Sequence, residues 1–170
     1  MAKLKMVGME AYIQQIRTIE DPAKVCRAAV RAGAGVIADG IRQELVSETK
    51  TISDKQALAA YQHKIKTYCS DSQKKGLLKG LGISKIRVNK GIYEAKVGFD
   101  GYNDVKTELW PEGQPNALIA QSVESGRTWM IKQPFVRPTV KRLQNTALEA
   151  MKRAADQKLE ELLGGNSDDN

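Results

Sequence analysis

The chain has 170 residues, 41% of them hydrophobic and 5% aromatic, which fits one domain of ordinary size with few aromatic residues in its core. Its 27 Lys and Arg outnumber its 20 Asp and Glu, and the net charge of +7 points to a nucleic acid, an acidic protein partner or simple solubility as the reason for the excess. No apolar run approaches the roughly 18 residues of a membrane span, and residues 1–12 lack the apolar segment of a signal peptide, so we expect a cytoplasmic protein without a membrane segment.

The N-terminal part of the chain predicts a short strand followed by two helices. Residues 4–7 are a strand candidate ended by Gly8, and the next apolar residues follow helical spacing, namely Met9, Tyr12, Ile13, Ile16 and Ile19. Asp21 and Pro22 are typical of a helix start, an N-cap followed by proline at the first helical position. An apolar stripe then predicts a long helix over about residues 22–46.

This long helix contains three glycines, Gly33, Gly35 and Gly40. Each lowers the intrinsic helix propensity by roughly 1 kcal/mol, which usually means that another element approaches closely at that point. We therefore expect the helix to be central and covered by a sheet or by a second helix.

A shorter and mostly polar helix follows. Ser53 can cap it, and its apolar positions are Leu58, Tyr61, Ile65 and Tyr68. Residues 70–75 are predicted to be an exposed loop.

The clearest strand signal lies at residues 83–99. Ile83, Ile86 and Val88 lead to Asn89-Lys90-Gly91, and the β-rich run of residues 92–99 returns. An Asn and a Gly in a short turn between two such runs indicate an antiparallel hairpin.

The region after the hairpin is rich in loop residues. Residues 100–116 include Trp110 and are expected to be irregular. Asn116 can cap a short helix that Gly126 closes. Residues 127–131 are a candidate third strand.

Residues 133–138 form a rigid extended segment. Pro134 and Pro138 push the residues before them towards extended conformations, and Pro138 also suits the first turn of a helix. The segment displays Phe135, which either fills the protein's own core or anchors a neighbouring subunit. We favour the core, because the segment leads directly into the last helix.

The last helix carries apolar residues at helical spacing from Val140 to Leu162, and residues 164–170 are predicted to be a disordered tail. Together these elements predict an α+β fold, in which a small antiparallel sheet packs against the long helix of the N-terminal half and the C-terminal helix. We expect residues 1–163 to form a single domain.

Patterns of catalysis or metal binding are scarce. His63 is the only histidine and lies in a polar helical segment, where a surface position is expected. Cys26 and Cys69 have no zinc-ligand spacing, and we expect two free thiols. The carboxylates follow no calcium-loop pattern and the glycines follow no phosphate-binding or dinucleotide pattern. The sequence therefore predicts no catalytic, cofactor or metal site and no enzymatic activity.

Charge is unevenly distributed along the chain. Residues 64–90 carry one acidic residue, Asp71, and a set of basic residues, namely Lys64, Lys66, Lys74, Lys75, Lys79, Lys85, Arg87 and Lys90. Residues 94–124 are net acidic. Such segregation suits head-to-tail association between copies, a nucleic-acid groove on the basic side, or two solvated surfaces without a partner.

The order of these motifs resembles the phage tail-completion family, the minor tail or neck proteins of long-tailed phages. The family pattern has Gly-x-Leu before a strand, Glu-x-Gly after a short helix, and Pro-Phe-x-x-Pro before the C-terminal helix. The corresponding residues here are Gly76, Leu77 and Leu78, then Glu124, Ser125 and Gly126, then Pro134, Phe135, Val136, Arg137 and Pro138. The resemblance covers about residues 6–162, with apparent insertions at about 48–75 (helical) and 100–116 (loop).

The resemblance implies a structural virion protein that completes the tail and joins it to the head without performing a reaction. Its copies would form a ring, expected to be a hexamer, around the DNA conduit. Its partners would be head-closure or connector proteins, tail-terminator or tail-tube proteins, and passing DNA contacted without sequence specificity. It would be assembled in the host cytoplasm and reside in the neck or tail of the virion.

The candidate assembly residues are Phe135, Arg137, Glu124, Lys85, Arg87, Lys90 and Trp110. The main alternative function is non-specific nucleic-acid binding through residues 64–90, although Tyr93 is the only aromatic residue near the hairpin and stacking platforms are scarce. A third alternative is a small hydrolase accessory or toxin-type enzyme built around His63.

Overall fold

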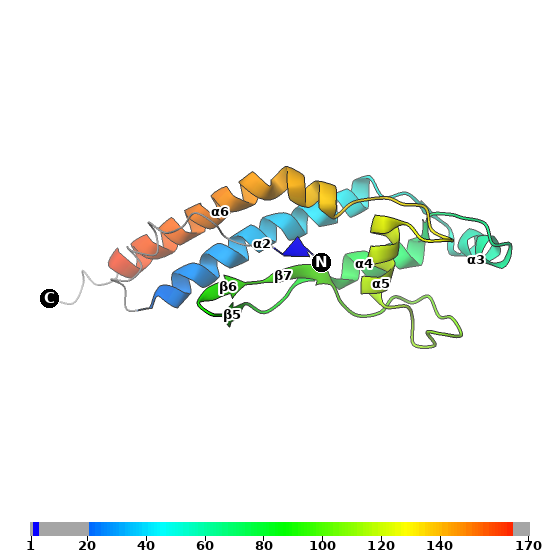
Figure 1. Ribbon diagram of the computed structural model, residues 1–170, viewed down its shortest axis with the longest axis horizontal. Helices are drawn as coiled ribbons and strands as arrows, with labels where there is room; N and C mark the ends of the chain where they lie inside the picture. Colours follow the sequence, from blue (N-terminus) through cyan, green and yellow to red (C-terminus); the bar gives the residue numbers. More distant parts are fainter. Residues whose placement is uncertain (1, 4–20, 165–170) are drawn as a thin grey trace.

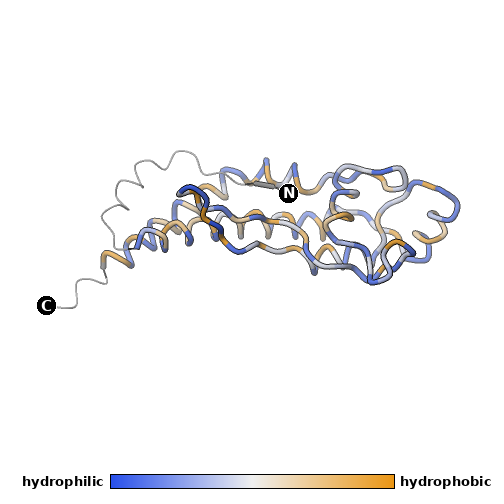
Figure 2. The backbone as a smooth tube through the Cα atoms, turned by 60° about the horizontal axis from the view of Figure 1, so that its bottom comes forward, coloured by the Kyte–Doolittle hydropathy of each residue, from blue (hydrophilic) through white to orange (hydrophobic). Residues whose placement is uncertain are grey.

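Two long helices run side by side along the length of the molecule (Figure 1). They are α2 (Pro22–Ser47) and α6 (Arg137–Gly164) in a computed structural model that describes residues 2–3 and 21–164. The helices run in opposite directions, and hydropathy alternates along both, as expected of helices with one buried face (Figure 2). The predicted helix over residues 22–46 is confirmed.

Close packing between α2 and α6 explains two of the three glycines in α2. A Cβ atom built on Gly33 would lie 2.5 Å from Cγ of Met151, and one built on Gly40 would run into the side chain of Leu143. A Cβ on Gly35 would meet nothing within 4 Å. The expectation of a close neighbour is therefore confirmed at Gly33 and Gly40 and wrong at Gly35, which faces open space.

Small antiparallel sheets lie against the other side of α2 (Figure 1). One sheet has the order β1 (Ala2–Lys3), β7 (Lys96–Phe99) and β4 (Leu81–Ile83). The predicted hairpin is β5 (Arg87–Asn89) with β6 (Ile92–Glu94). Lys90 and Gly91 connect these strands with φ angles of 49° and 77°, the left-handed pair that a tight hairpin turn requires. The predicted α+β fold, with the sheet packed against the two long helices, is confirmed.

The region after α2 contains a second pair of helices. A short parallel pair, β2 (Thr51–Ile52) and β3 (Cys69–Ser70), brackets α3 (Asp54–Gln62). Ser53 caps α3 as predicted, in a reciprocal capping box with Gln56. The helix ends earlier than expected, so Ile65 and Tyr68 lie beyond it.

The predicted loop at residues 70–75 is wrong, because these residues begin α4 (Asp71–Gly80). Ser70 accepts from the backbone N–H of Gln73 and Gln73 accepts from that of Ser70, a second capping box. The carboxylate of Asp54 adds bonds from the hydroxyl and N–H of Ser72 at 2.7 and 3.2 Å, which joins α3 to the start of α4. Hydrogen bonds from Ser70 and Ser72 lower the pKa of Asp54.

Residues 100–116 are irregular, as predicted, and lead into α5 (Asn116–Ser125). Pro115, and not Asn116, occupies the cap position of α5. The Asn116 amide is buried and donates to the carbonyl of Asp100 at 2.8 Å. This side chain therefore fixes the start of the loop of residues 100–116 and does not cap α5. Gly126 ends α5 at a φ of 75°, as predicted.

The predicted third strand at residues 127–131 is wrong. Arg127 and Met130 form a tight turn through reciprocal backbone hydrogen bonds of 3.0 and 3.2 Å, and Thr67 pairs with Met130 in an isolated bridge.

Several predictions fall outside the described residues. These are the strand at residues 4–7, the helix from Met9 to Ile19, and the tail beyond Gly164, where α6 ends. Among the residues that are described, no helix combines the length and the hydropathy that crossing a membrane requires.

Candidate assembly surface

Three of the candidate residues, Glu124, Phe135 and Arg137, meet where α5 is joined to α6. The carboxylate of Glu124 accepts hydrogen bonds from the backbone N–H groups of Phe135 at 2.7 Å, Val136 at 2.8 Å and Arg137 at 3.1 Å. The N–H groups at a helix start have no partner within the helix, and a negative charge there is favoured by the helix dipole. Glu124 thus caps α6 from a different helix.

Phe135 lies in the protein's own core. Its side chain is 1% exposed, and its ring packs edge to face against Phe99 with centroids 5.8 Å apart. Of the two roles considered for Phe135, the structure places it in the core. Because the ring is buried, it does not present a surface for a neighbouring subunit.

Arg137 lies over the outside of this junction. Its side chain is 73% exposed, with Nε 3.2 Å from the Glu124 carboxylate and a guanidinium N–H donating to the Ser125 hydroxyl at 3.0 Å. The extended segment is also fastened on its other side, where the Gln133 side chain forms reciprocal hydrogen bonds with the backbone of Lys50 at 2.8 and 3.0 Å. This junction is therefore a rigid structural joint.

Arg87 and Lys90 belong to the β5–β6 hairpin and Lys85 lies two residues before it, and all three side chains are exposed. Val88 and Ile92, on the same hairpin, are about half exposed, at 50% and 49%. This region therefore combines three cations with one half-exposed apolar side chain on each face of the hairpin.

The basic segment of residues 64–90 does not form one continuous surface. Lys64 and Lys66 follow α3 at one end of the molecule, and the hairpin lies towards the other end (Figure 1). Between them, the ammonium group of Lys74 donates to the backbone carbonyls of Val46 at 3.2 Å and Thr49 at 2.9 Å. Lys74 thus closes the C-terminus of α2, where a cation is favoured.

Trp110 lies apart from the other candidates, in the loop of residues 100–116. It is 37% exposed, and the neighbouring Leu109 is 85% exposed. The loop also exposes four carboxylates, Asp100, Asp104, Glu108 and Glu112.

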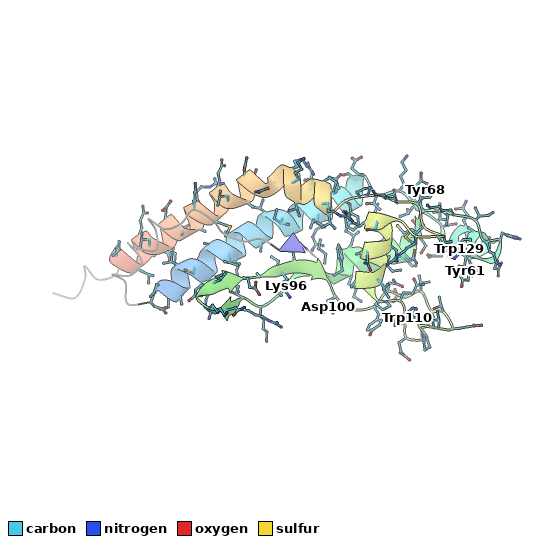
Figure 3. All side chains as sticks on the ribbon, in the orientation of Figure 1. Tyr61, Tyr68, Lys96, Asp100, Trp110 and Trp129 are labelled. Carbon is cyan, nitrogen blue, oxygen red and sulfur yellow. The ribbon has the colours of Figure 1, made fainter. Side chains whose placement is uncertain are left out.

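Large apolar side chains are exposed at the end of the molecule that carries α3. Figure 3 places Tyr61, Tyr68, Trp110 and Trp129 in this region. We define the apolar end by its exposed side chains, which come from three separate segments and are Leu58, Tyr61, Ile65, Leu109, Trp110 and Trp129.

These three segments are held in place by specific contacts. The N–H of Thr67 donates to the carbonyl of Trp129 at 3.1 Å, which joins the segment after α3 to the turn before the extended segment. The loop of residues 100–116 is anchored to α4 by a 2.8 Å hydrogen bond from the Gln73 amide to the Gln114 side chain. The apolar end is therefore built on fixed elements.

Five residues of the apolar end were not among the predicted candidates, namely Leu58, Tyr61, Ile65, Leu109 and Trp129. The sequence signal for the first three was an apolar face at helical spacing, which predicts burial. Yet α3 contains no buried residue. The signal available in the sequence was the presence of Leu and Tyr in a mostly polar helix, a composition that also suits a contact surface.

The two cysteine thiols are not activated, and the described acidic, cysteine and histidine side chains are not clustered. Burial raises the pKa of the Cys69 thiol to about 11, so this group stays protonated at neutral pH. Burial also raises the pKa of Cys26. Within residues 2–3 and 21–164, no group of three or more His, Cys, Asp and Glu is arranged to hold a metal ion. His63 caps the end of α3 and is exposed.

Comparisons with protein-family models, with curated proteins and with solved structures each found no match for this chain.

Proposed function

We propose that this protein is a structural component of the neck or tail of a long-tailed phage, where it completes the tail and joins it to the head. Its copies form a ring around the DNA conduit, expected to be a hexamer, between the connector or head-closure proteins and the tail-terminator or tail-tube proteins. The protein carries out no reaction in this role, and passing DNA is contacted without sequence specificity. The proposal rests on the resemblance to the tail-completion family together with the apolar end.

The apolar end is the observation that carries the proposal. Large apolar groups that gather in one region of the surface are unfavourable in water unless a partner covers them. Tyr61 is 68% exposed and Leu109 is 85% exposed, and two tryptophans lie in the same region. Tryptophan and tyrosine are the residues most enriched at the centres of protein interfaces. A structural role in an assembly accounts for this surface.

The test is a joining assay in the phage or prophage genome that encodes the chain. Deleting the gene should leave separate heads and tails in electron micrographs, and purified protein should restore joining. A variant with Tyr61→Ser and Leu109→Ser should keep its helical circular dichroism but fail to restore joining, because both side chains are exposed and contribute little to the fold.

The matched control is Leu163→Ser with Lys152→Ser, which changes one exposed apolar and one exposed polar residue on α6, away from the apolar end. This control should restore joining as well as the unchanged protein does. Intact virions from the deletion, or full restoration by the apolar-end variant, would overturn the proposal.

A further inference from the structure

Two exposed surfaces of opposite charge lie apart on the same molecule. The first, the hairpin surface, consists of Lys85, Arg87 and Lys90 with the apolar Ile92, which shares a face of the hairpin with Arg87, whereas Val88 lies on the opposite face. The second, the loop surface, consists of Asp104, Glu108 and Glu112 around the apolar Leu109 and Trp110.

The charges of the two surfaces match in size. Residues 84–96 contain four basic residues and one acidic residue, and residues 100–116 contain four acidic residues and one basic residue. No ion pair within the described residues uses any of the six charged side chains that define the two surfaces. All six side chains are exposed.

Both surfaces have a fixed backbone. The hairpin is paired from Arg87 with Glu94 to Asn89 with Ile92 and closes through its left-handed turn. In the loop, Thr107 and Trp110 exchange backbone hydrogen bonds of 3.1 and 3.0 Å, which places Leu109 at the tip of a tight turn. A rigid surface loses little conformational entropy when it binds.

The two surfaces cannot meet within one chain. Strand β7 separates them, with the hairpin before its first residue, Lys96, and the loop after Asp100. In Figure 1 both lie on the side of the molecule away from α6, but they are displaced from each other along the long axis. A second copy is therefore the simplest partner that presents the complementary charge.

We propose that the hairpin surface of one copy binds the loop surface of the next copy. The contact joins unlike surfaces, and each subunit carries one of each, so successive contacts form a ring when the rotation from one copy to the next closes. Leu109 and Trp110 supply apolar contact, and the opposite charges set the register and speed association. This inference rests on the proposed function, because it specifies how the ring is held together.

The experiment is a charge exchange followed by sedimentation velocity. The hairpin variant carries Lys85→Glu, Arg87→Glu and Lys90→Glu, and the loop variant carries Asp104→Lys, Glu108→Lys and Glu112→Lys. Each variant alone should self-associate at least about tenfold more weakly than the unchanged protein, because like charges then face each other at every contact. Circular dichroism should show that both variants are folded, since all six side chains are exposed.

Complementation is the decisive measurement. An equimolar mixture of the two variants should recover assembly, because every contact in an alternating ring again joins opposite charges. A chain that carries all six changes should also assemble alone. The control, Lys141→Glu with Lys152→Glu and Arg153→Glu on exposed positions of α6, should assemble like the unchanged protein.

Two results overturn the inference and separate it from the proposed function. If either variant assembles normally, or if the mixture fails to recover assembly, the hairpin surface does not bind the loop surface. In that case a ring formed by the unchanged protein still supports the proposed function. If the unchanged protein forms no ring, alone or on isolated heads and tails, both proposals fail.

Discussion

At the scale of single residues, Glu124 explains why two separated motifs occur in the same chain. The Glu-Ser-Gly motif ends α5, and the Pro-Phe-Val-Arg-Pro motif begins α6. The Glu124 carboxylate of the first motif accepts hydrogen bonds from the backbone N–H groups of the second motif. The exposed side chain of Arg137 forms an ion pair with the same carboxylate. The two motifs are therefore one structural unit.

We expect Glu124→Ala to reduce the free energy of unfolding by roughly 2–4 kcal/mol, because hydrogen bonds to a buried carboxylate are lost and the start of α6 loses its cap. Arg137→Ala should cost at most about 1 kcal/mol, since its ion pair is exposed to solvent. Urea denaturation of both variants measures the difference. Equal losses would show that Glu124 acts mainly through its pair with Arg137.

We expect Phe135→Ala to cost roughly 3–5 kcal/mol and to lower the melting temperature sharply, because a fully buried ring is removed from the contact with Phe99. Phe135→Leu should cost clearly less, because it retains most of the apolar volume. A thermal melt beside an oligomer profile measures both effects. An unshifted melt with lost assembly is the contrary result and would make Phe135 an interface residue.

At the scale of secondary-structure elements, the pairing of α2 with α6 depends on small residues at chosen points. Gly33 faces Met151, and Gly40 faces Leu143 and Thr139. Removing the side chain at these positions brings the helices close together, which offsets the loss of helix propensity. Gly35 faces open space and has no such reason to be glycine.

The two neighbouring glycines should therefore respond in opposite directions to alanine. Gly35→Ala should stabilise the protein by about 0.5–1 kcal/mol, because the helix gains propensity without a clash. Gly33→Ala should destabilise it by roughly 1–3 kcal/mol, because the added methyl group forces Met151 to move. Chemical denaturation distinguishes the two, and a stabilising Gly33→Ala would mean that Met151 repacks freely.

At the scale of the whole molecule, the fold distributes charge differently from the sequence. The basic segment of residues 64–90 runs from the α3 end to the hairpin, and Lys74 is engaged with α2. The acidic segment of residues 94–124 is also divided. Glu124 is buried, whereas the carboxylates of the loop of residues 100–116 are exposed. Only short charged surfaces remain, and their effects on binding should be modest and dependent on salt.

Self-association should therefore weaken as salt is raised. The screening length falls from about 10 Å at 0.1 M salt to about 3 Å at 1 M, which reduces the attraction between exposed opposite charges. Sedimentation velocity at these two concentrations should show a shift towards smaller species at high salt. An assembly distribution that does not change with salt contradicts the expectation that charge contributes to the contact.

Binding to duplex DNA should be weak and indifferent to sequence, with dissociation constants of about 1 µM or weaker at physiological salt. The reason is that the cations are spread over the molecule instead of lining one groove. Fluorescence anisotropy with two unrelated duplexes measures the affinity, and Lys85→Gln with Arg87→Gln should weaken both complexes by the same factor. Nanomolar, sequence-selective binding would favour the alternative nucleic-acid-binding function.

Local sequence signals were sufficient for the elements that depend on local chemistry. The apolar stripe and Pro22 predicted α2, Ser53 predicted the start of α3, and the Asn-Lys-Gly turn predicted the hairpin. Gly126 ended α5 as expected. In each case the position of the helix or turn follows from the backbone preference of a residue or from the spacing of apolar residues within that segment.

The tertiary structure decided what depends on residues far apart in the chain. The sequence could not show that Glu124 caps α6, that Lys74 closes α2, or that α3 leaves its apolar residues uncovered. A hydrogen-bond partner or a covering surface comes from another element, so it is set by how the elements pack. The predicted loop at residues 70–75 failed for a different reason, because Ser70 and Gln73 form a capping box, a local signal of a helix start, and Asp54 adds a long-range contact to it. Local propensity therefore fixes the helices and the hairpin, whereas packing fixes which of their side chains remain available to a partner.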